Sequence, residues 1–231
     1  MDESIFTAAE DDEIILCMNY DGLYGINNIN RFLQQSNSNK STFWGMLEFK
    51  IGDPILFNES ERFAPMIYNN MKGKITGIEI LDVGQVTDRI QFDVLVDTLI
   101  NEDDVWWQDF EVPSNNGVDE TEIRFGVNKL KNVDDDEENS LSTVMPFQIA
   151  YTVSIHKAQG LEYRSVKIVI TDEIDELIIH NIFYTAITRA REKLKIYWTP
   201  EVEQAVLERI KPKDVKKDVG ILRKYLNEQR K

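Results

Sequence analysis

The spacing of hydrophobic residues changes twice along the chain. Residues 13–18 form a short apolar run typical of a buried strand, and apolar residues then recur at helical spacing from 26 to 33. From about residue 49 to 112 the pattern changes to short β-type runs separated by Gly, Asn and Asp. Beyond residue 143, apolar runs are again separated by helical patterns, which is typical of βαβ units and a parallel sheet.

These changes predict an α/β domain that is interrupted by a β-rich insertion. We expect residues 1–50 and 143–231 to form one domain around a parallel sheet, and residues 51–142 to form a small, mostly antiparallel β insertion. Four strands are predicted in the insertion, at Pro54–Asn58, Lys74–Leu81, Gln91–Val96 and Val105–Val112. In the last third, strands are predicted at Phe147–Ile155, Val166–Thr171 and Leu194–Trp198. The tail pattern predicts two terminal helices joined near Pro212.

The charge distribution qualifies a net charge of −15, which taken alone argues against a nucleic-acid-binding protein. Residues 93–142 carry 15 acidic and 3 basic side chains, whereas residues 151–231 carry 12 acidic and 16 basic ones. The acid gathers in three runs, Asn101–Asp104, Asp119–Glu122 and Asp134–Glu138, which we expect to be solvated loops. The last of these runs lacks the residue spacing of a calcium loop. The basic final third leaves nucleic acid open as a partner.

Composition also limits which cellular compartment and which kinds of site we expect for this protein. One cysteine and two histidines exclude a disulfide framework and argue against a metal site, so we expect no bound metal. The first 13 residues are acidic where a signal peptide would be basic and then apolar, and no apolar run approaches a membrane span. A cytoplasmic protein that does not contact a membrane is therefore expected.

Two arginines stand at the polar end of an apolar helical pattern. Residues 179–190 carry apolar side chains at intervals of three and four, which predicts a buried helix stripe. Arg189 and Arg191 follow within the segment Tyr184–Arg191, Tyr-Thr-Ala-Ile-Thr-Arg-Ala-Arg. Arginine suits phosphate recognition because its charge is permanent and its fork of donors matches phosphate oxygens. Tyr184 fits core packing at least as well as ligand contact, and Arg191 fits a solvated basic face.

A second polar segment, Ser154–Glu162, reads Ser-Ile-His-Lys-Ala-Gln-Gly-Leu-Glu. A strand that ends near residue 155 would deliver Ser154, His156 and Lys157 to the carboxyl edge of a parallel sheet, where open α/β folds bind ligands. The Ser154 hydroxyl can donate to a phosphate oxygen. An ordinary strand-to-helix turn with surface polar groups explains the same residues, and His156 fits a positioning role better than acid–base chemistry.

The second half of this segment adds three further candidates. Gly160 would let a backbone approach closely, because it has no side chain. Gln159 and Glu162 supply polar groups that could link a nucleic-acid site to a nucleotide site.

Taken in this order, Ser154–Glu162 and Tyr184–Arg191 resemble motifs V and VI of superfamily 1 DNA helicases. Residues 21–34 look like the opening of the second RecA-like domain in RecD-type helicases. Residues 52–57 and 67–73 are similar to the start of the SH3-like insertion in the same proteins. The chain as a whole therefore resembles the carboxy-terminal half of a RecD/UvrD-type helicase, which implies a RecA-like fold of the P-loop NTPase type.

The resemblance implies roles for named residues. Arg189 would be an arginine finger directed at the γ-phosphate of ATP on the other RecA-like domain, and Glu162 would contact the ribose, with Gln159 and Gly160 beside it. Ser154, where the family usually has Thr, would contact single-stranded DNA, as would His156 and Lys157. The implied partners are single-stranded DNA and an N-terminal RecA-like domain. The implied cofactor is ATP with Mg²⁺ in the intact enzyme, and the implied translocation is 5′ to 3′.

Missing motifs limit what this chain can do alone. The phosphate-binding sequence G-x-x-x-x-G-K-[ST] does not occur in it, and no apolar run before Ser154 ends in an Asp-Glu pair. We therefore expect the isolated chain neither to hydrolyse ATP, nor to bind it tightly, nor to unwind DNA.

Two other classes stay open. One is a stand-alone or degenerate nucleic-acid-binding or protein-binding module that keeps the fold without motor activity. The other is an unrelated small-molecule enzyme on an α/β sheet, which the lack of a nucleophile elbow, a metal cluster or paired catalytic carboxylates disfavours. A phosphate-binding loop upstream of residue 1 would favour the helicase interpretation over both.

Overall fold

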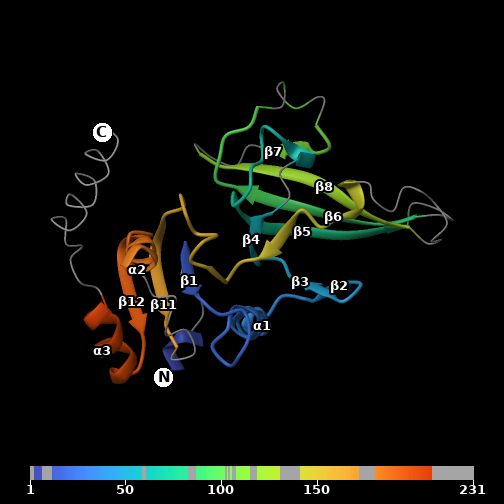
Figure 1. The fold of residues 1–231 in the computed structure, drawn as a ribbon. Helices are drawn as coiled ribbons and strands as arrows, with labels where there is room; N and C mark the ends of the chain where they lie inside the picture. The colour runs from blue at the N-terminus through green and yellow to red at the C-terminus, as the bar shows by residue number, and fades with distance from the viewer. Residues whose placement is uncertain are drawn as a thin grey trace, which may run out of the picture.

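Two β-sheets lie side by side in this protein (Figure 1). The computed structural model describes residues 3–6, 12–58, 61–82, 87–101, 103, 105, 108–114, 119–130, 141–171 and 180–209. Within these residues one sheet has four parallel strands and the other has six antiparallel strands. The predicted α/β fold class with a separate antiparallel sheet is confirmed.

The parallel sheet has the strand order β10-β1-β11-β12. Its strands are β1 (Glu13–Cys17), β10 (Thr152–Ser154), β11 (Tyr163–Val169) and β12 (Ala190–Tyr197). Strand β1 is apolar on both faces because both are covered. Helix α1 (Ile26–Ser36) packs on the face that carries Ile15, whereas α2 (His180–Ile187) and α3 (Pro200–Arg209) pack on the face that carries Ile14.

The antiparallel sheet has the strand order β7-β8-β6-β5-β4-β9 and its own core. Its strands are β4 (Pro54–Phe57), β5 (Lys72–Asp82), β6 (Thr87–Val96), β7 (Glu111–Ser114), β8 (Thr121–Leu130) and β9 (Phe147–Ile149). Mutually packed aromatic rings fill this core: Phe49, Phe57, Phe63, Phe92, Phe125 and Phe147. A separate hairpin, β2 (Thr42–Trp44) with β3 (Leu47–Phe49), and the short helices η1 (Glu3–Phe6), η2 (Glu61–Phe63) and η5 (Leu141–Thr143) complete the described elements.

The structure differs from the sequence predictions in several elements. The run 147–155 is two strands in different sheets, because β9 pairs with β4 whereas β10 pairs with β1. Strand β8 was not predicted, since acidic residues open it; Thr121 is fully buried, and Glu122 accepts a hydrogen bond of 2.7 Å from Thr76 Oγ1. In the predicted strand 105–112, only the end belongs to β7. The predicted second tail helix and the acidic run 134–138 lie outside the described residues.

The predicted domain limits stay a prediction. The parallel strands come from residues 13–17 and 152–197, as the interrupted-domain hypothesis requires. Strand β9, which the hypothesis assigned to the α/β domain, instead lies at the edge of the antiparallel sheet.

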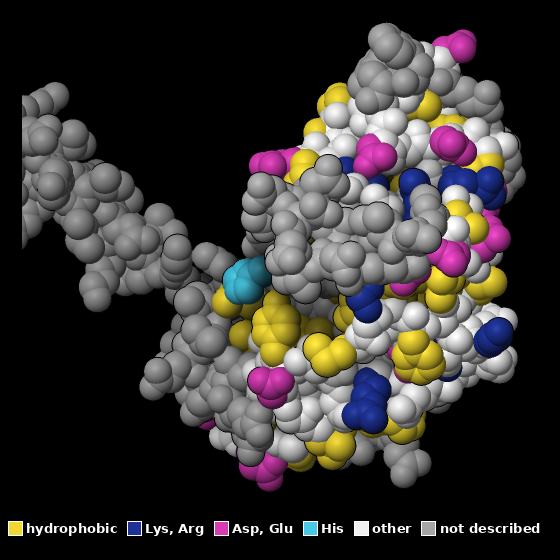
Figure 2. Space-filling view, turned by 90° about the vertical axis from the view of Figure 1, so that its right-hand side faces the viewer, with side chains coloured by type: hydrophobic (Ala, Val, Ile, Leu, Met, Phe, Trp, Pro, Cys, Tyr) yellow, Lys and Arg dark blue, Asp and Glu magenta, His cyan; other side chains and the backbone are white. Residues whose placement is uncertain are grey.

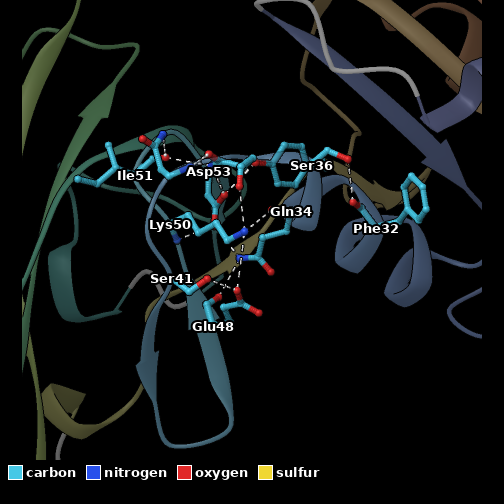
Figure 3. A network of polar contacts seen from close by, with 11 residues as sticks. Phe32, Gln34, Ser36, Ser41, Glu48, Lys50, Ile51 and Asp53 are labelled. Carbon is cyan, nitrogen blue, oxygen red and sulfur yellow. Dashed lines mark hydrogen bonds and ion pairs between the residues drawn. The ribbon is translucent and has the colours of Figure 1, made fainter.

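A buried carboxylate joins the two sheets (Figure 3). Asp53, immediately before β4, is fully buried. Its Oδ2 accepts hydrogen bonds from Gln34 Nε2 of α1 (2.6 Å) and from the Lys50 backbone N–H (2.9 Å). Its Oδ1 accepts from Asn37 Nδ2 (2.9 Å) and from Tyr151 Oη (2.8 Å). Burial and the charge of Asp53 together raise the pKa of Tyr151, so the phenol stays protonated and donates to the carboxylate.

The buried ammonium of Lys50 lies in the same network. It does not bond Asp53 directly; it donates to the carbonyls of Gln34 and Asn37, both at 2.9 Å, at the end of α1. The Gln34 carbonyl also accepts the N–H of Asn37, the residue that follows α1, at 3.2 Å, and the positive charge beside these two carbonyls stabilises the carboxyl end of the helix. The network therefore fixes α1, the start of β4 and the residue before β10 relative to one another.

Replacing the central carboxylate should destabilise the whole fold. In Asp53→Ala the side-chain donors of Gln34, Asn37 and Tyr151 lose their buried acceptor, and leaving a buried donor unsatisfied costs about 1–3 kcal/mol. We expect a loss of at least about 3 kcal/mol in the free energy of unfolding, measured by urea denaturation. The exposed Asp119→Ala is the matched control, with an expected change within about 0.5 kcal/mol. A loss under about 1 kcal/mol for Asp53→Ala would contradict this assignment.

Candidate functional site

The carboxyl edge of the parallel sheet carries Ser154. It is the last residue of β10, and it pairs with Cys17 of the neighbouring β1. The chain then turns back on itself, because the Ser154 carbonyl accepts hydrogen bonds from the N–H groups of Lys157 (3.0 Å) and Ala158 (3.3 Å). The hydroxyl also accepts from the Lys157 N–H at 3.3 Å. The side chain is largely buried, so this turn rather than solvent sets its orientation.

The two residues next to this turn differ in how free their side chains are. His156 is exposed at the same edge. Lys157 is half-buried, and its ammonium donates a hydrogen bond to the side-chain oxygen of Gln148 in β9. His156 therefore stands free at the predicted edge of the sheet, whereas Lys157 is held by the antiparallel sheet.

The exposed turn that follows contains Gln159 and Gly160. Gly160 has φ +82°, a left-handed conformation that glycine adopts without strain. A Cβ added at this position would meet no atom within 4 Å. Within this chain the glycine is therefore required by the backbone conformation, and the space beside it is open to an approaching group.

The amino edge of the same sheet carries Glu162 and Arg189. Glu162 immediately precedes β11, and Arg189 immediately precedes β12. The Glu162 side chain is exposed, whereas Arg189 is half-buried. All three guanidinium nitrogens of Arg189 donate hydrogen bonds: Nε to the Thr185 carbonyl (2.9 Å), Nη1 to the Leu161 carbonyl (2.9 Å) and Nη2 to Thr188 Oγ1 (3.0 Å).

The candidate residues thus divide between two ends of one sheet. Because the strands are parallel, the residue that ends β10 and the residues that precede β11 and β12 lie at opposite edges. The segment 155–162 crosses from one edge to the other. Ser154, His156 and Lys157 form one group at the carboxyl edge. Glu162 and Arg189 form the other group, since Arg189 contacts Leu161, the residue next to Glu162. The structure does not bring the two groups to a common edge.

The helix before Arg189 is shorter than predicted. α2 ends at Ile187, and Ala190 already pairs with Tyr163 in the parallel sheet. Hydrogen bonds from the Thr188 hydroxyl to the Tyr184 and Thr185 carbonyls compete with continuation of the helix. Arg189 therefore stands in the turn between α2 and β12 instead of on a helix face, while Tyr184 is exposed and does not belong to the core.

Sequence reasoning missed a charged cluster at the amino edge. Asp12 stands directly before β1 in a left-handed conformation, φ +58°. Its Oδ2 accepts hydrogen bonds from the Arg164 N–H (2.8 Å) and from Arg191 Nη2 (2.5 Å), and its Oδ1 pairs with Lys72 Nζ at 3.1 Å. Arg191, predicted as a solvated basic residue, is thus an ion-pair partner. No pattern in the sequence distinguishes Asp12 from the acidic residues around it.

Side chains of this cluster border a cleft of about 690 Å³ between the two sheets. Lys72, Tyr151 and Tyr163 are among the residues that line it. On the face drawn in Figure 2, the coloured acidic and basic side chains are interspersed with hydrophobic ones and form no continuous basic patch.

Among the described helices, none is both long enough and apolar enough to cross a membrane.

Residues 149–197 match the family model of the UvrD-like helicase C-terminal domain. This range contains the turn at Ser154 and the turn at Arg189. The RecBCD enzyme subunit RecD of Buchnera aphidicola subsp. Schizaphis graminum is 24% identical over 193 residues, which are 81% of this chain and 25% of that protein. The RecBCD enzyme subunit RecD of Buchnera aphidicola subsp. Acyrthosiphon pisum is 25% identical over 187 residues, which are 79% of this chain and 24% of that protein.

The chain thus spans about a quarter of the length of these curated relatives. The Pif1 helicase structure from Candida albicans superposes with a TM-score of 0.53 at 13% identity, covering 96% of this chain and 52% of that one. That superposition supports the fold. The family match and the RecD relatives support the similarity of this chain to the carboxy-terminal half of a superfamily 1 helicase.

The amino-edge cluster makes a prediction about pH. Burial raises the pKa of the Asp12 carboxyl, but hydrogen bonds from Arg164, Lys72 and Arg191 and the charge of Lys72 outweigh it, so the pKa lies below its ordinary value. A carboxyl with a lowered folded-state pKa stabilises the fold above its unfolded pKa of about 3.9, and this contribution is lost as the pH falls through the folded value.

We therefore expect Asp12→Asn to lower the free energy of unfolding by about 1 kcal/mol at pH 7, with the deficit shrinking below about pH 4. Urea denaturation of both proteins across this range measures the difference, with the exposed Asp119→Asn as control. A deficit that is unchanged at pH 3, or that grows as the pH falls, would contradict the ion-pair role of Asp12.

Proposed function

We propose that this chain, whose residues 149–197 resemble the UvrD-like helicase C-terminal domain, is the carboxy-terminal motor domain of an ATP-dependent DNA helicase. One observation carries the proposal. The matched segment forms two turns at opposite edges of one parallel sheet, one with a hydroxyl and exposed polar groups and the other with an arginine. A motor that couples nucleotide hydrolysis to movement on DNA needs separate sites that are rigidly connected.

The carboxyl edge is the proposed contact with single-stranded DNA. Within the described part of the chain the Ser154 hydroxyl accepts a hydrogen bond from the Lys157 N–H, and we propose that it donates its hydrogen to a phosphate oxygen. His156, exposed beside it, would contact the backbone as a hydrogen-bond donor. Lys157 would add positive charge from its position against Gln148. Contacts of this kind fix the position of the strand and carry no sequence information.

The amino edge is the proposed nucleotide side. Arg189 would act as an arginine finger toward ATP and Mg²⁺ held chiefly by a first RecA-like domain, and its planar fork suits phosphate oxygens. To reach that phosphate it would exchange some of its three hydrogen bonds within the chain for phosphate contacts. Glu162, an exposed carboxylate on the same edge, fits an acceptor for ribose hydroxyls, with Gln159 and Gly160 along the connecting segment.

These residues form only part of an active site. The chain lacks the phosphate-binding loop motif, so ATP hydrolysis is proposed only for the assembly with a first RecA-like domain, and no tight nucleotide binding is proposed for this chain alone. We place the reaction in the cytoplasm, where ATP and DNA are available.

A second function is favoured by one observation. Because every guanidinium nitrogen of Arg189 has a partner within the chain, this arginine also suits a purely structural role. The protein would then be a binding module for nucleic acid or protein that keeps the helicase fold without motor activity. Measuring ATP turnover separates the two functions.

In a protein that joins this chain to a first RecA-like domain, Arg189→Ala should lower DNA-stimulated ATP turnover by at least about 100-fold, since arginine fingers contribute about 10³–10⁵ in rate. Affinity for single-stranded DNA should change little. Ser154→Ala should weaken DNA affinity by at least about tenfold, since one hydrogen bond to a charged group contributes about 1.5–3 kcal/mol, and should leave nucleotide affinity unchanged.

Turnover and DNA dissociation constants are measured at matched salt, because phosphate contacts depend on ionic strength. Lys40→Ala, which removes an exposed charge from the loop before β2, is the control for a general loss of charge. Turnover of Arg189→Ala within about twofold of wild type, less than about 1 kcal/mol of barrier, would reject the finger and favour the binding module.

A further inference from the structure

One lysine of the antiparallel sheet reaches the amino edge of the parallel sheet. Lys72 is the first residue of β5, and its ammonium pairs with Asp12 Oδ1 at 3.1 Å. The same ammonium donates to the backbone carbonyl of Glu162 at 3.1 Å and lies over the ring of Tyr163, 4.6 Å from its centroid. Asp97, its partner directly after β6, is more distant at 3.4 Å. Most contacts of this cation therefore cross between the sheets.

Asp12 extends this contact along the backbone of β11. Its carboxylate accepts the Arg164 N–H at 2.8 Å, and its carbonyl accepts the Ser165 N–H at 3.2 Å. Lys72 thus holds the carbonyl of Glu162, directly before β11, and Asp12 holds the amides of Arg164 and Ser165 at the start of this strand. This is where the segment that crosses from the carboxyl edge enters the parallel sheet.

The same few residues hold Arg189. The Tyr163 N–H donates to the Arg189 carbonyl at 2.8 Å, and Arg189 Nη1 donates to the Leu161 carbonyl at 2.9 Å. A displacement of the backbone at Glu162 would therefore move both the carbonyl that holds the guanidinium and the amide that holds its main chain. Lys72 is separated from Arg189 by only this short stretch of backbone.

We infer that Lys72 is a positioning residue, through which the antiparallel sheet holds residues 161–164 and thereby sets the positions of Glu162 and Arg189. Its consequence for catalysis rests on the proposed function, but the positioning itself does not. The contact uses an ammonium whose side chain is 24% exposed, so removing it should leave both hydrophobic cores intact. A change in the antiparallel sheet that moves the start of β5 would be transmitted directly to the nucleotide side.

Hydrogen exchange of the 231-residue chain tests the positioning. Lys72→Met removes the charge and the donors while keeping an unbranched side chain. In this variant we expect the Tyr163 and Arg164 amides to exchange at least about tenfold faster. The amides of residues 90–94 in the central strand β6 should keep their wild-type rates, and they show whether the opening is local or global. Asp97→Asn, which removes only the partner that follows β6, and Lys40→Met should each leave the β11 amides within about twofold of wild type.

Either of two results would overturn the inference: unchanged exchange at Tyr163 and Arg164 in Lys72→Met, or acceleration of equal size in β6 and β11. The second result would show that Lys72 only stabilises the fold as a whole. Because the comparison is between two sheets of one protein, a general loss of stability cannot imitate the expected outcome.

Turnover then separates positioning from the proposed function. In the protein that also carries a first RecA-like domain, Lys72→Met should lower the DNA-stimulated kcat about tenfold with the single-stranded DNA dissociation constant within about twofold of wild type. Lys72→Arg, which keeps the charge and its donors, should recover most of that loss. Accelerated exchange with unchanged kcat would retain the positioning role and reject the catalytic role of the amino edge.

Discussion

The buried carboxylate of Asp53 is the contact on which the arrangement of the two sheets depends. Leu56 of β4 packs into the core on one face of the parallel sheet, but apolar packing is non-directional, so it specifies poorly how one sheet is oriented on the other. Four hydrogen bonds converge on Asp53 from α1, from the backbone at Lys50 and from Tyr151. Directional bonds to a fully buried charge tolerate little displacement, so they define one arrangement.

This arrangement places polar groups at both ends of the parallel sheet. Tyr151 lies three residues before Ser154, so the Asp53 network supports the strand that leads to the carboxyl edge. At the amino edge, Lys72 and Asp12 hold the start of β11. The antiparallel sheet thus contacts the parallel sheet near both proposed sites. In a helicase such an insertion would be well placed to relate DNA contact to nucleotide contact.

Much of this organisation was accessible from the sequence, but the contacts between its parts were not. The hydrophobic pattern predicted β1 from a short apolar run, and it predicted α1 and the change to antiparallel strands from the spacing of apolar residues. It missed β8, since acidic residues at 119–122 conceal a strand whose apolar face begins with Ile123. The length of α2 and the start of β12 were wrong because pairing with β11 decides where that helix gives way to strand.

The sequence likewise identified some of the candidate residues and missed others. Ser154 and Arg189 were identified by short motifs, and the structure places each in a turn at an edge of the parallel sheet. Asp12, Lys72 and Asp53 were not identified, because the contacts that define their roles join distant parts of the chain. Asp12 and Lys72 are 60 residues apart, Lys72 and Glu162 are 90 apart, and Asp53 and Tyr151 are 98 apart.

Three-dimensional structures of the chain joined to a first RecA-like domain, with single-stranded DNA and ADP–aluminium fluoride, provide the most direct test. We expect Arg189 to leave the Leu161 carbonyl and lie about 2.7–3.2 Å from the fluoride, with Ser154 on a DNA phosphate. Arg189 still bonded to Leu161 and Thr185, with the fluoride out of reach, would contradict the proposed division of the sheet into a DNA edge and a nucleotide edge.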